Sequence, residues 1–226
     1  MGSGFLPAAS GFDRGGGRMI ASILKLSRVD NKALRITDDY SLHRVIYGLF
    51  DDIRSEEEKR ASVPSGFLFA DKGGDAEGRL ILMLSDREPK RPEYGTLKSK
   101  IVPATFLDHD RYRFEVIINP TRRENERHKL VPIRRSDDIS KWFTAKAHAS
   151  WGFSVNQESL DIQLLPVKQF LKNDHQLTLG GAVISGNLRV EDRPLFIKSF
   201  KNGIGRGRAF GFGLLQIAPL IFSNNS

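Results

Sequence analysis

Tyr40, His43 and Tyr47 have the types and the spacing to carry out acid–base chemistry on a phosphate. Histidine suits proton transfer because its ordinary pKa is about 6.5, whereas a phenol, with a pKa near 10, is a poor base but can orient a phosphate. Residues three and four apart share one flank of a helix, so the spacing predicts an imidazole beside two phenols at the rim of an apolar face. The alternative is a rim histidine without a role.

The other histidines carry weaker signals. His109 lies in a turn between strands, His128 lies among basic side chains that suit contact with a nucleic acid, and His148 and His175 are assigned nothing. No His-x3-His pair and no carboxylate cluster has metal-ligand spacing, so we expect neither a metal site nor a cofactor. The chain has no cysteine, which excludes disulfides and thiolate nucleophiles and fits a reducing cytoplasm.

The most specific segment is glycine-rich and runs from residue 203 to residue 213, where five glycines alternate with two arginines and two phenylalanines. Glycine lets backbone N–H groups approach an anion closely, and arginine adds bidentate phosphate contacts. No Lys-Ser/Thr pair follows the glycines, which excludes a Walker loop, and the helix-then-strand order excludes a Rossmann loop. We therefore expect this loop either to form a structural turn or to hold a nucleic-acid backbone through Gly203, Gly205, Arg206, Gly207 and Arg208.

The charge balance also favours a polyanionic partner. The formal net charge is +8 and the pI is about 9.8, although basic residues can serve solubility alone. Segment 122–135 is the best candidate for clamping an RNA stem, because A-form grooves are read mostly through phosphates and 2′-hydroxyls. Glu124 and Glu126 keep open the alternative of a solvated linker. The basic residues of this segment are Arg122, Arg123, Arg127, Lys129, Arg134 and Arg135, and Lys198 and Lys201 extend the basic surface.

The sequence predicts that these residues lie on a mixture of helices and strands, so the fold class is α+β. In the first half we expect strands over 19–26, 67–70, 79–84 and 98–106, a hairpin loop over 71–75 and a solvated segment over 55–60. A helix begins in the cluster 38–41, and its apolar face is Leu42, Val45, Ile46, Leu49 and Ile53.

The second half has the order βαββαβ. Strands are expected over 112–118, 159–170, 176–190 and 213–220, with one helix capped by residues 136–138 and another that opens at Pro194. The element order predicts two tandem ferredoxin-like (RRM-like) domains, at 19–107 and 108–226, after a disordered leader at 1–18. The second helix of the first domain is degraded. No apolar run approaches the roughly 18 residues of a membrane helix.

The chain resembles a known family at its C-terminus. Segment 203–215, which continues into Ala218-Pro219-Leu220, resembles the terminal signature of CasE, the CRISPR-repeat endoribonuclease of the type I-E Cascade complex. Tyr40-Ser41-Leu42-His43 is similar to that family's Tyr-x-x-His motif, and Asn119-Pro120 after a strand also fits. The resemblance covers residues 19–220.

This resemblance implies a cytoplasmic, metal-independent endoribonuclease that binds the CRISPR repeat RNA stem-loop and cuts at the 3′ base of the stem. It implies attack by the 2′-hydroxyl, products with 2′,3′-cyclic phosphate and 5′-hydroxyl ends, and retention of the crRNA among the other Cascade subunits. His43 would act as general acid or base with Tyr40 as its assistant, and Tyr47 would contact RNA. The alternative is a module of the same fold that binds RNA without cutting it. An NTP-dependent enzyme is disfavoured by the missing loops.

Overall fold

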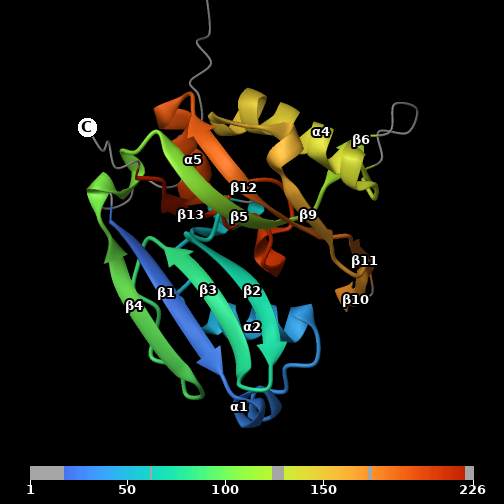
Figure 1. The fold of residues 1–226 in the computed structure, drawn as a ribbon. Coiled ribbons are helices and arrows are strands. Elements are labelled where there is room, and N and C mark those ends of the chain that lie inside the picture. The colour runs from blue at the N-terminus through green and yellow to red at the C-terminus, as the bar shows by residue number, and fades with distance from the viewer. Residues whose placement is uncertain (1–17, 62, 124–129, 173–174, 222–226) are drawn as a thin grey trace, which may run out of the picture.

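The structure, a computed structural model, describes residues 18–61, 63–123, 130–172 and 175–221, with the backbone alone over 168–172 and 175–179. Two larger antiparallel sheets organise it (Figure 1). The N-terminal sheet has the order β2 (Phe67–Asp75), β3 (Gly78–Ser85), β1 (Met19–Leu26), β4 (Thr96–Val102). The C-terminal sheet has the order β13 (Gln216–Pro219), β5 (Arg111–Ile118), β12 (Ala182–Val190), β8 (Phe153–Val155), and β9 (Asp161–Leu164) also pairs with β12.

The two sheets share one topology. In each half the first and third strands are central and the second and fourth form the edges, which is the ferredoxin-like arrangement. Helix α2 (Asp39–Gly48) lies behind the N-terminal sheet, and α4 (Ser136–Lys146) and α5 (Arg193–Asn202) accompany the C-terminal one (Figure 1). The predicted α+β fold of two tandem ferredoxin-like units is confirmed, while the predicted leader lies almost entirely outside the described residues.

Shorter elements complete the described chain. Helices α1 (Arg28–Ala33) and α3 (Glu56–Arg60) flank α2 along the sequence. Two small hairpins extend from the C-terminal half, β6 (Thr121–Arg123) with β7 (Leu130–Pro132), and β10 (Lys168–Lys172) with β11 (His175–Leu179). The 3-10 turns are η1 (Ala104–Leu107), η3 (Gln157–Ser159) and η4 (Arg208–Phe210), and a π-helical turn, η2 (Ala147–Trp151), follows α4.

Several predicted boundaries are wrong for identifiable reasons. Helix α2 ends at Gly48, so Ile53 lies beyond it and is 53% exposed. In the segment 55–60, expected to be a solvated extension or loop, residues 56–60 form α3, because Ser55 and Glu58 make a capping box. The predicted hairpin loop over 71–75 is mostly strand with a bulge. The last strand starts three residues later than predicted, because Gly213 has a φ of +84° and its N–H donates to the Ile117 carbonyl.

Strands β2 and β3 of the N-terminal sheet, and parts of β1, contribute buried residues to clusters on both faces by simple alternation, whereas edge strand β4 is mostly exposed. On β2, Phe67 and Phe69 join the apolar cluster that α2 covers through Leu42 and Ile46. The intervening residues, Leu68 and Ala70, join the larger cluster formed mainly by the C-terminal half. This explains the near-continuous apolar runs of β1, β2 and β3. It also places α2 against one face while the C-terminal half covers the other.

Candidate active site

Helix α2, which carries the predicted catalytic residues, has a strong N-terminal cap. The Asp38 carboxylate accepts from the Ser41 N–H and hydroxyl, both at 2.7 Å, and the Ser41 hydroxyl oxygen accepts from the Asp38 N–H at 3.0 Å. These bonds close a capping box, and the hydrogen bonds from Ser41 lower the pKa of the Asp38 carboxyl below its ordinary value. The first turn of α2 therefore has a defined orientation.

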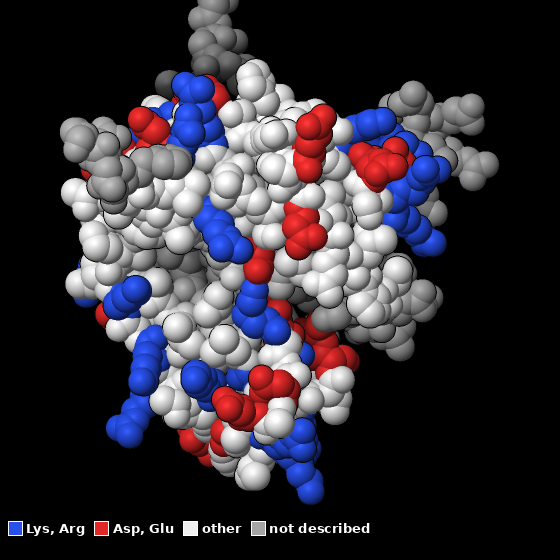
Figure 2. All heavy atoms as spheres, viewed as in Figure 1, with Lys and Arg blue, Asp and Glu red and all other residues white. Residues whose placement is uncertain are grey.

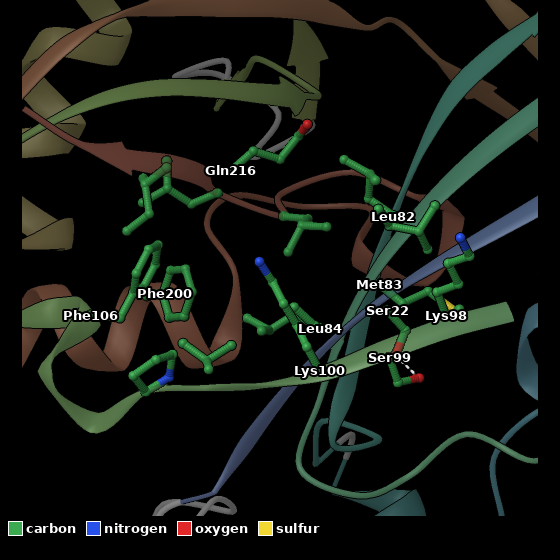
Figure 3. Close-up of a pocket in the computed structure, with 17 residues that line it drawn as sticks. Ser22, Leu82, Met83, Leu84, Lys98, Ser99, Lys100, Phe106, Phe200 and Gln216 are labelled. Carbon is green, nitrogen blue, oxygen red and sulfur yellow. Dashed lines mark hydrogen bonds between the residues drawn. The ribbon is translucent and has the colours of Figure 1, made fainter.

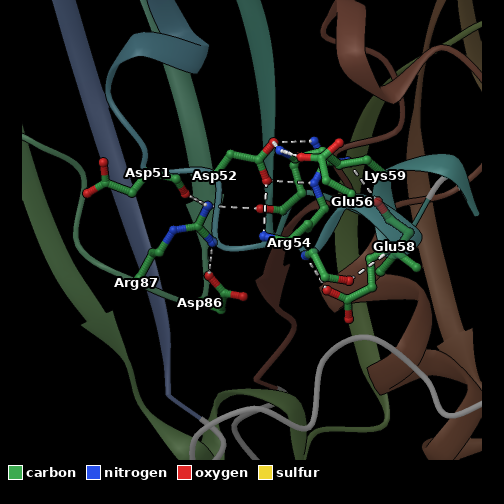
Figure 4. Close-up of polar contacts among 11 residues, drawn as sticks. Asp51, Asp52, Arg54, Glu56, Glu58, Lys59, Asp86 and Arg87 are labelled. Atoms are coloured by element: carbon green, nitrogen blue, oxygen red, sulfur yellow. Dashed lines mark hydrogen bonds and ion pairs between the residues drawn. The ribbon is translucent and has the colours of Figure 1, made fainter.

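A network of charges fixes the chain after α2 (Figure 4). The Arg87 guanidinium donates to the carbonyls of Asp51 and Ser65, at 2.6 and 3.0 Å, and pairs with Asp86 at 2.7 Å. Arg54 donates to Asp52 at 2.8 Å, and this hydrogen bond lowers the pKa of the Asp52 carboxyl to about 2. The segment that follows α2 is thereby tied to the ends of β2 and β3.

Among the side chains that the structure describes, three aromatic rings lie around His43. Its ring centroid lies 3.9 Å from that of Tyr47 and 6.0 Å from that of Tyr40, and the Tyr40 and imidazole planes are 14° apart. The third ring, Phe210, lies 5.4 Å away and comes from the glycine-rich segment. All four side chains are partly buried. The prediction that both phenols share the flank of the imidazole is confirmed.

Two neighbours of His43 could not be predicted from spacing along α2. The carbonyl of Ala209 lies 2.6 Å from His43 Nδ1, and the two residues are 166 positions apart in sequence. Phe210 comes from the same turn, so only the fold brings this turn to α2. Arg44, directly after His43, is exposed and lies 5.8 Å over the Tyr40 ring, which places a cation at the rim of the group.

The glycines of the 203–213 segment are needed for packing as well as for conformation. All five have φ between +73° and +84°. A Cβ on Gly205 would lie 3.0 Å from the Ile118 side chain, one on Gly211 would lie 3.0 Å from the Phe69 ring, and one on Gly213 would lie 2.2 Å from the Ile204 carbonyl oxygen. The structural-turn alternative therefore accounts for much of the glycine pattern.

The arginines of this segment are placed differently. Arg206 and Arg208 are exposed, and Arg208 donates to the Asn202 carbonyl at 2.8 Å. The charges of Arg206 and Arg208 take no part in packing against the sheets. That these two arginines contact RNA stays a prediction. The glycine contacts to RNA predicted for Gly203, Gly205 and Gly207 likewise remain untested.

The described part of the basic segment 122–135 lies in strands β6 and β7 of the small hairpin and in the residues that lead to α4, whose N-cap is Arg135. Arg122, Arg123, Arg134 and Arg135 are exposed, while Lys129 lies outside the described residues. Figure 1 places this hairpin beside α4, apart from α2, and Figure 2 shows Lys and Arg side chains gathered there with acidic ones among them. The structure therefore separates the predicted stem clamp from the predicted catalytic group.

A cavity of about 520 Å³ lies on the face of the N-terminal sheet opposite α2. Phe106, Phe200 and Gln216 border it on one side, and Lys98 and Lys100 on β4 border it on another (Figure 3). No predicted site residue lines it. A smaller cavity, of about 40 Å³, is lined by Phe210 and the two residues after it.

Within the described residues, no group of three or more His, Cys, Asp and Glu side chains is arranged to hold a metal ion. In the same residues no helix is long and apolar enough to cross a membrane.

A family model described as "CRISPR associated protein" matches residues 20–219. The chain belongs to the CRISPR associated protein family. The match spans both ferredoxin-like units, so the family comprises the tandem arrangement and not one half of it.

Solved structures of the same fold include CRISPR endoribonucleases. Cse3 of Thermus thermophilus, described as bound to an RNA representing a pre-cleavage complex, is 21% identical with a TM-score of 0.72 over 90% of this chain and 100% of that one. Cas6e of Escherichia coli is 22% identical with a TM-score of 0.66 over 89% of this chain and 100% of that one. A component of a CRISPR RNA-guided surveillance complex is 20% identical with a TM-score of 0.67 over 89% and 100% of the two chains. No curated protein sequence matches the chain significantly. At these identities the matches establish the fold.

Proposed function

We propose that this CRISPR associated protein is the endoribonuclease that cuts CRISPR repeat RNA at the 3′ base of its stem-loop. The observation that carries the proposal is the placement of His43, with phenols on both sides and the cation of Arg44 at the rim. The likeness in fold to Cse3 and Cas6e supports the RNA substrate. A fold hosts many activities, so the specific chemistry rests on the residues of the site.

The reaction assigned to this site needs proton transfer and charge stabilisation. The ribose 2′-oxygen bonds to the adjacent phosphorus while the bond from phosphorus to the 5′ oxygen breaks, which leaves 2′,3′-cyclic phosphate and 5′-hydroxyl ends. A base takes the 2′-hydroxyl proton, and an acid protonates the departing 5′ oxygen. His43 performs one of these transfers, and Tyr40 orients the phosphate. Arg44 lies where it can offset the negative charge that grows on the phosphate oxygens.

The rest of the surface would hold the substrate. The basic side chains of the β6–β7 hairpin suit the phosphates of an A-form stem, and Arg206 and Arg208 suit the backbone near the cut. Tyr47 completes the RNA-contacting group on α2. The other Cascade subunits are the proposed protein partners, because a surveillance-complex component shares the fold.

Cleavage in excess EDTA tests the proposed chemistry. Repeat RNA and the same RNA with 2′-deoxyribose just upstream of the cut are incubated with the full chain, and the ends of the products are identified by mass spectrometry. We expect the all-ribose RNA to be cut to 2′,3′-cyclic phosphate ends and the deoxy substrate to be bound but left intact. Cutting of the deoxy substrate, or loss of all activity in EDTA, would refute the mechanism. Binding without cutting of either RNA would favour the non-catalytic alternative.

A further inference from the structure

The short contact between His43 and Ala209 defines the protonation of the ring. A backbone carbonyl oxygen can only accept a hydrogen bond, so the proton of the 2.6 Å contact belongs to His43 Nδ1. A neutral imidazole carries one N–H, and its lone pair then resides on Nε2. This contact therefore selects one of two tautomers, and free histidine in water favours the other one.

The turn that supplies the carbonyl is built to hold one shape. Residues 208–210 form the 3-10 turn η4, which Gly207 and Gly211 bound at φ values of +84° and +83°. The Phe210 N–H donates to the Gly207 carbonyl at 2.8 Å and closes the turn. Both glycines also lie tightly against aromatic rings, since a Cβ on Gly207 would approach the Phe212 ring to 3.0 Å and one on Gly211 the Phe69 ring to 3.0 Å.

The same turn contacts the ring in a second way. Phe210, the residue after Ala209, places its ring centroid 5.4 Å from the imidazole centroid at an angle of 34°. The carbonyl thus constrains the direction of the Nδ1–Nε2 axis, while Phe210 and Tyr47 constrain the ring plane. A side chain that transfers a proton must be held in both position and plane, because a small error in the orientation of its ring slows the chemical step.

We propose that Ala209 is a positioning residue whose carbonyl holds His43 as the Nδ1–H tautomer, so that Nε2 is the nitrogen that exchanges a proton with the RNA. This inference rests on the proposed function for its catalytic consequence, but the tautomer itself does not. It gives the glycine-rich turn a task beyond packing and phosphate contact. The active site is then formed jointly by α2 and the C-terminal unit.

The test combines a spectroscopic readout with kinetics on the full chain. Protein labelled with ¹⁵N-histidine is measured by two-bond ¹⁵N–¹H correlation at a pH where the rings are neutral, and a His43→Gln sample assigns the His43 signals. Gly207→Ala is compared with Gly73→Ala, which imposes similar strain at a φ of +80° in the β2–β3 hairpin, where a Cβ meets no atom within 4 Å. Single-turnover cleavage and equilibrium binding of repeat RNA are measured on the same samples.

We expect wild-type His43 to carry its proton on Nδ1. In Gly207→Ala this tautomer is lost or mixed, and the single-turnover cleavage rate at saturating RNA falls about 10- to 100-fold. Gly73→Ala changes neither the tautomer nor the rate. A wild-type ring protonated on Nε2 overturns the proposal, whatever the variants do. So does a Gly207→Ala protein that cuts slowly with an unchanged tautomer. If wild type fails to cut RNA at all, the proposed function fails while the tautomer assignment is still decided.

Discussion

Replacement of Asp38 by alanine probes how the site is held in place. The substitution removes the acceptor for the Ser41 N–H, a donor on a residue that is only 6% exposed. The Ser41 hydroxyl can still donate to the Asp38 carbonyl at 2.8 Å, so one backbone donor loses its partner. Loss of a cap costs about 1 kcal/mol and up to about 2 kcal/mol in a partly buried setting. We therefore expect destabilisation by about 1–2 kcal/mol, which corresponds to a fall in Tm of roughly 2–8 °C for a chain of this size.

Urea and thermal unfolding, followed by circular dichroism, measure this effect. Asp38→Asn retains an acceptor and should stay within about 0.5 kcal/mol of wild type. Ser27→Ala removes the equivalent capping bond from α1, a helix without buried residues that carries no site residue. It should cost no more than about 1 kcal/mol and leave RNA cleavage unchanged, whereas Asp38→Ala should slow cleavage about tenfold through the misplaced first turn of α2. An Asp38→Ala protein as stable as wild type, or equal slowing of cleavage by Ser27→Ala, would show that the Asp38 cap does not position the site.

Three further outcomes are expected. Gly213→Ala should lower the free energy of unfolding, measured by urea titration, by more than about 2 kcal/mol. The cause is the new Cβ, which would lie 2.2 Å from the Ile204 carbonyl oxygen at a residue with left-handed backbone. A loss under about 1 kcal/mol would contradict this prediction. Arg122→Ala and Arg123→Ala should each reduce the salt dependence of RNA binding by about one unit of slope without changing the single-turnover rate at saturation, and an unchanged slope would remove the hairpin from the interface. The pKa of the Asp52 carboxyl is lowered from 3.8 to about 2 in the folded protein. The ionised carboxylate therefore stabilises the fold fully above pH 3.8, and this stabilisation is lost as the pH falls toward 2. The free energies of unfolding of wild type and Asp52→Asn, measured as the pH is lowered, should therefore converge near pH 2.

The part of the site that lies within one helix could be predicted from the sequence. Helical periodicity alone places Tyr40, His43 and Tyr47 on one flank, and the structure has them there. The apolar residues of segment 19–26 likewise predict a strand, and β1 has the predicted bounds, Met19–Leu26. Local rules suffice where both partners of a contact lie within one or two turns of each other.

The partners that come from distant segments could not be predicted in this way. Ala209 acts through its carbonyl, which every residue possesses, so no side-chain type marks it. In the sequence, Phe210 is only one residue of a glycine-rich segment whose composition suggests anion binding, and nothing in that segment predicts a contact with His43. Its place beside His43 follows from packing of that segment against Phe69 and Ile118, which depends on the register of two separate sheets. The apolar spacing also predicts too long a helix, because Ile53 continues the spacing beyond Gly48, where α2 ends.

Single-turnover cleavage of repeat RNA tests whether His43 carries the chemistry. Wild type is compared with His43→Ala and with His148→Ala, a control at an exposed histidine, after equal RNA affinity has been established for all three. We expect His43→Ala to cut about 10²- to 10⁴-fold more slowly, because a general acid or base is lost, and His148→Ala to cut at the wild-type rate. A His43→Ala protein that binds RNA and cuts it within about threefold of the wild-type rate would show that His43 is not the general acid or base.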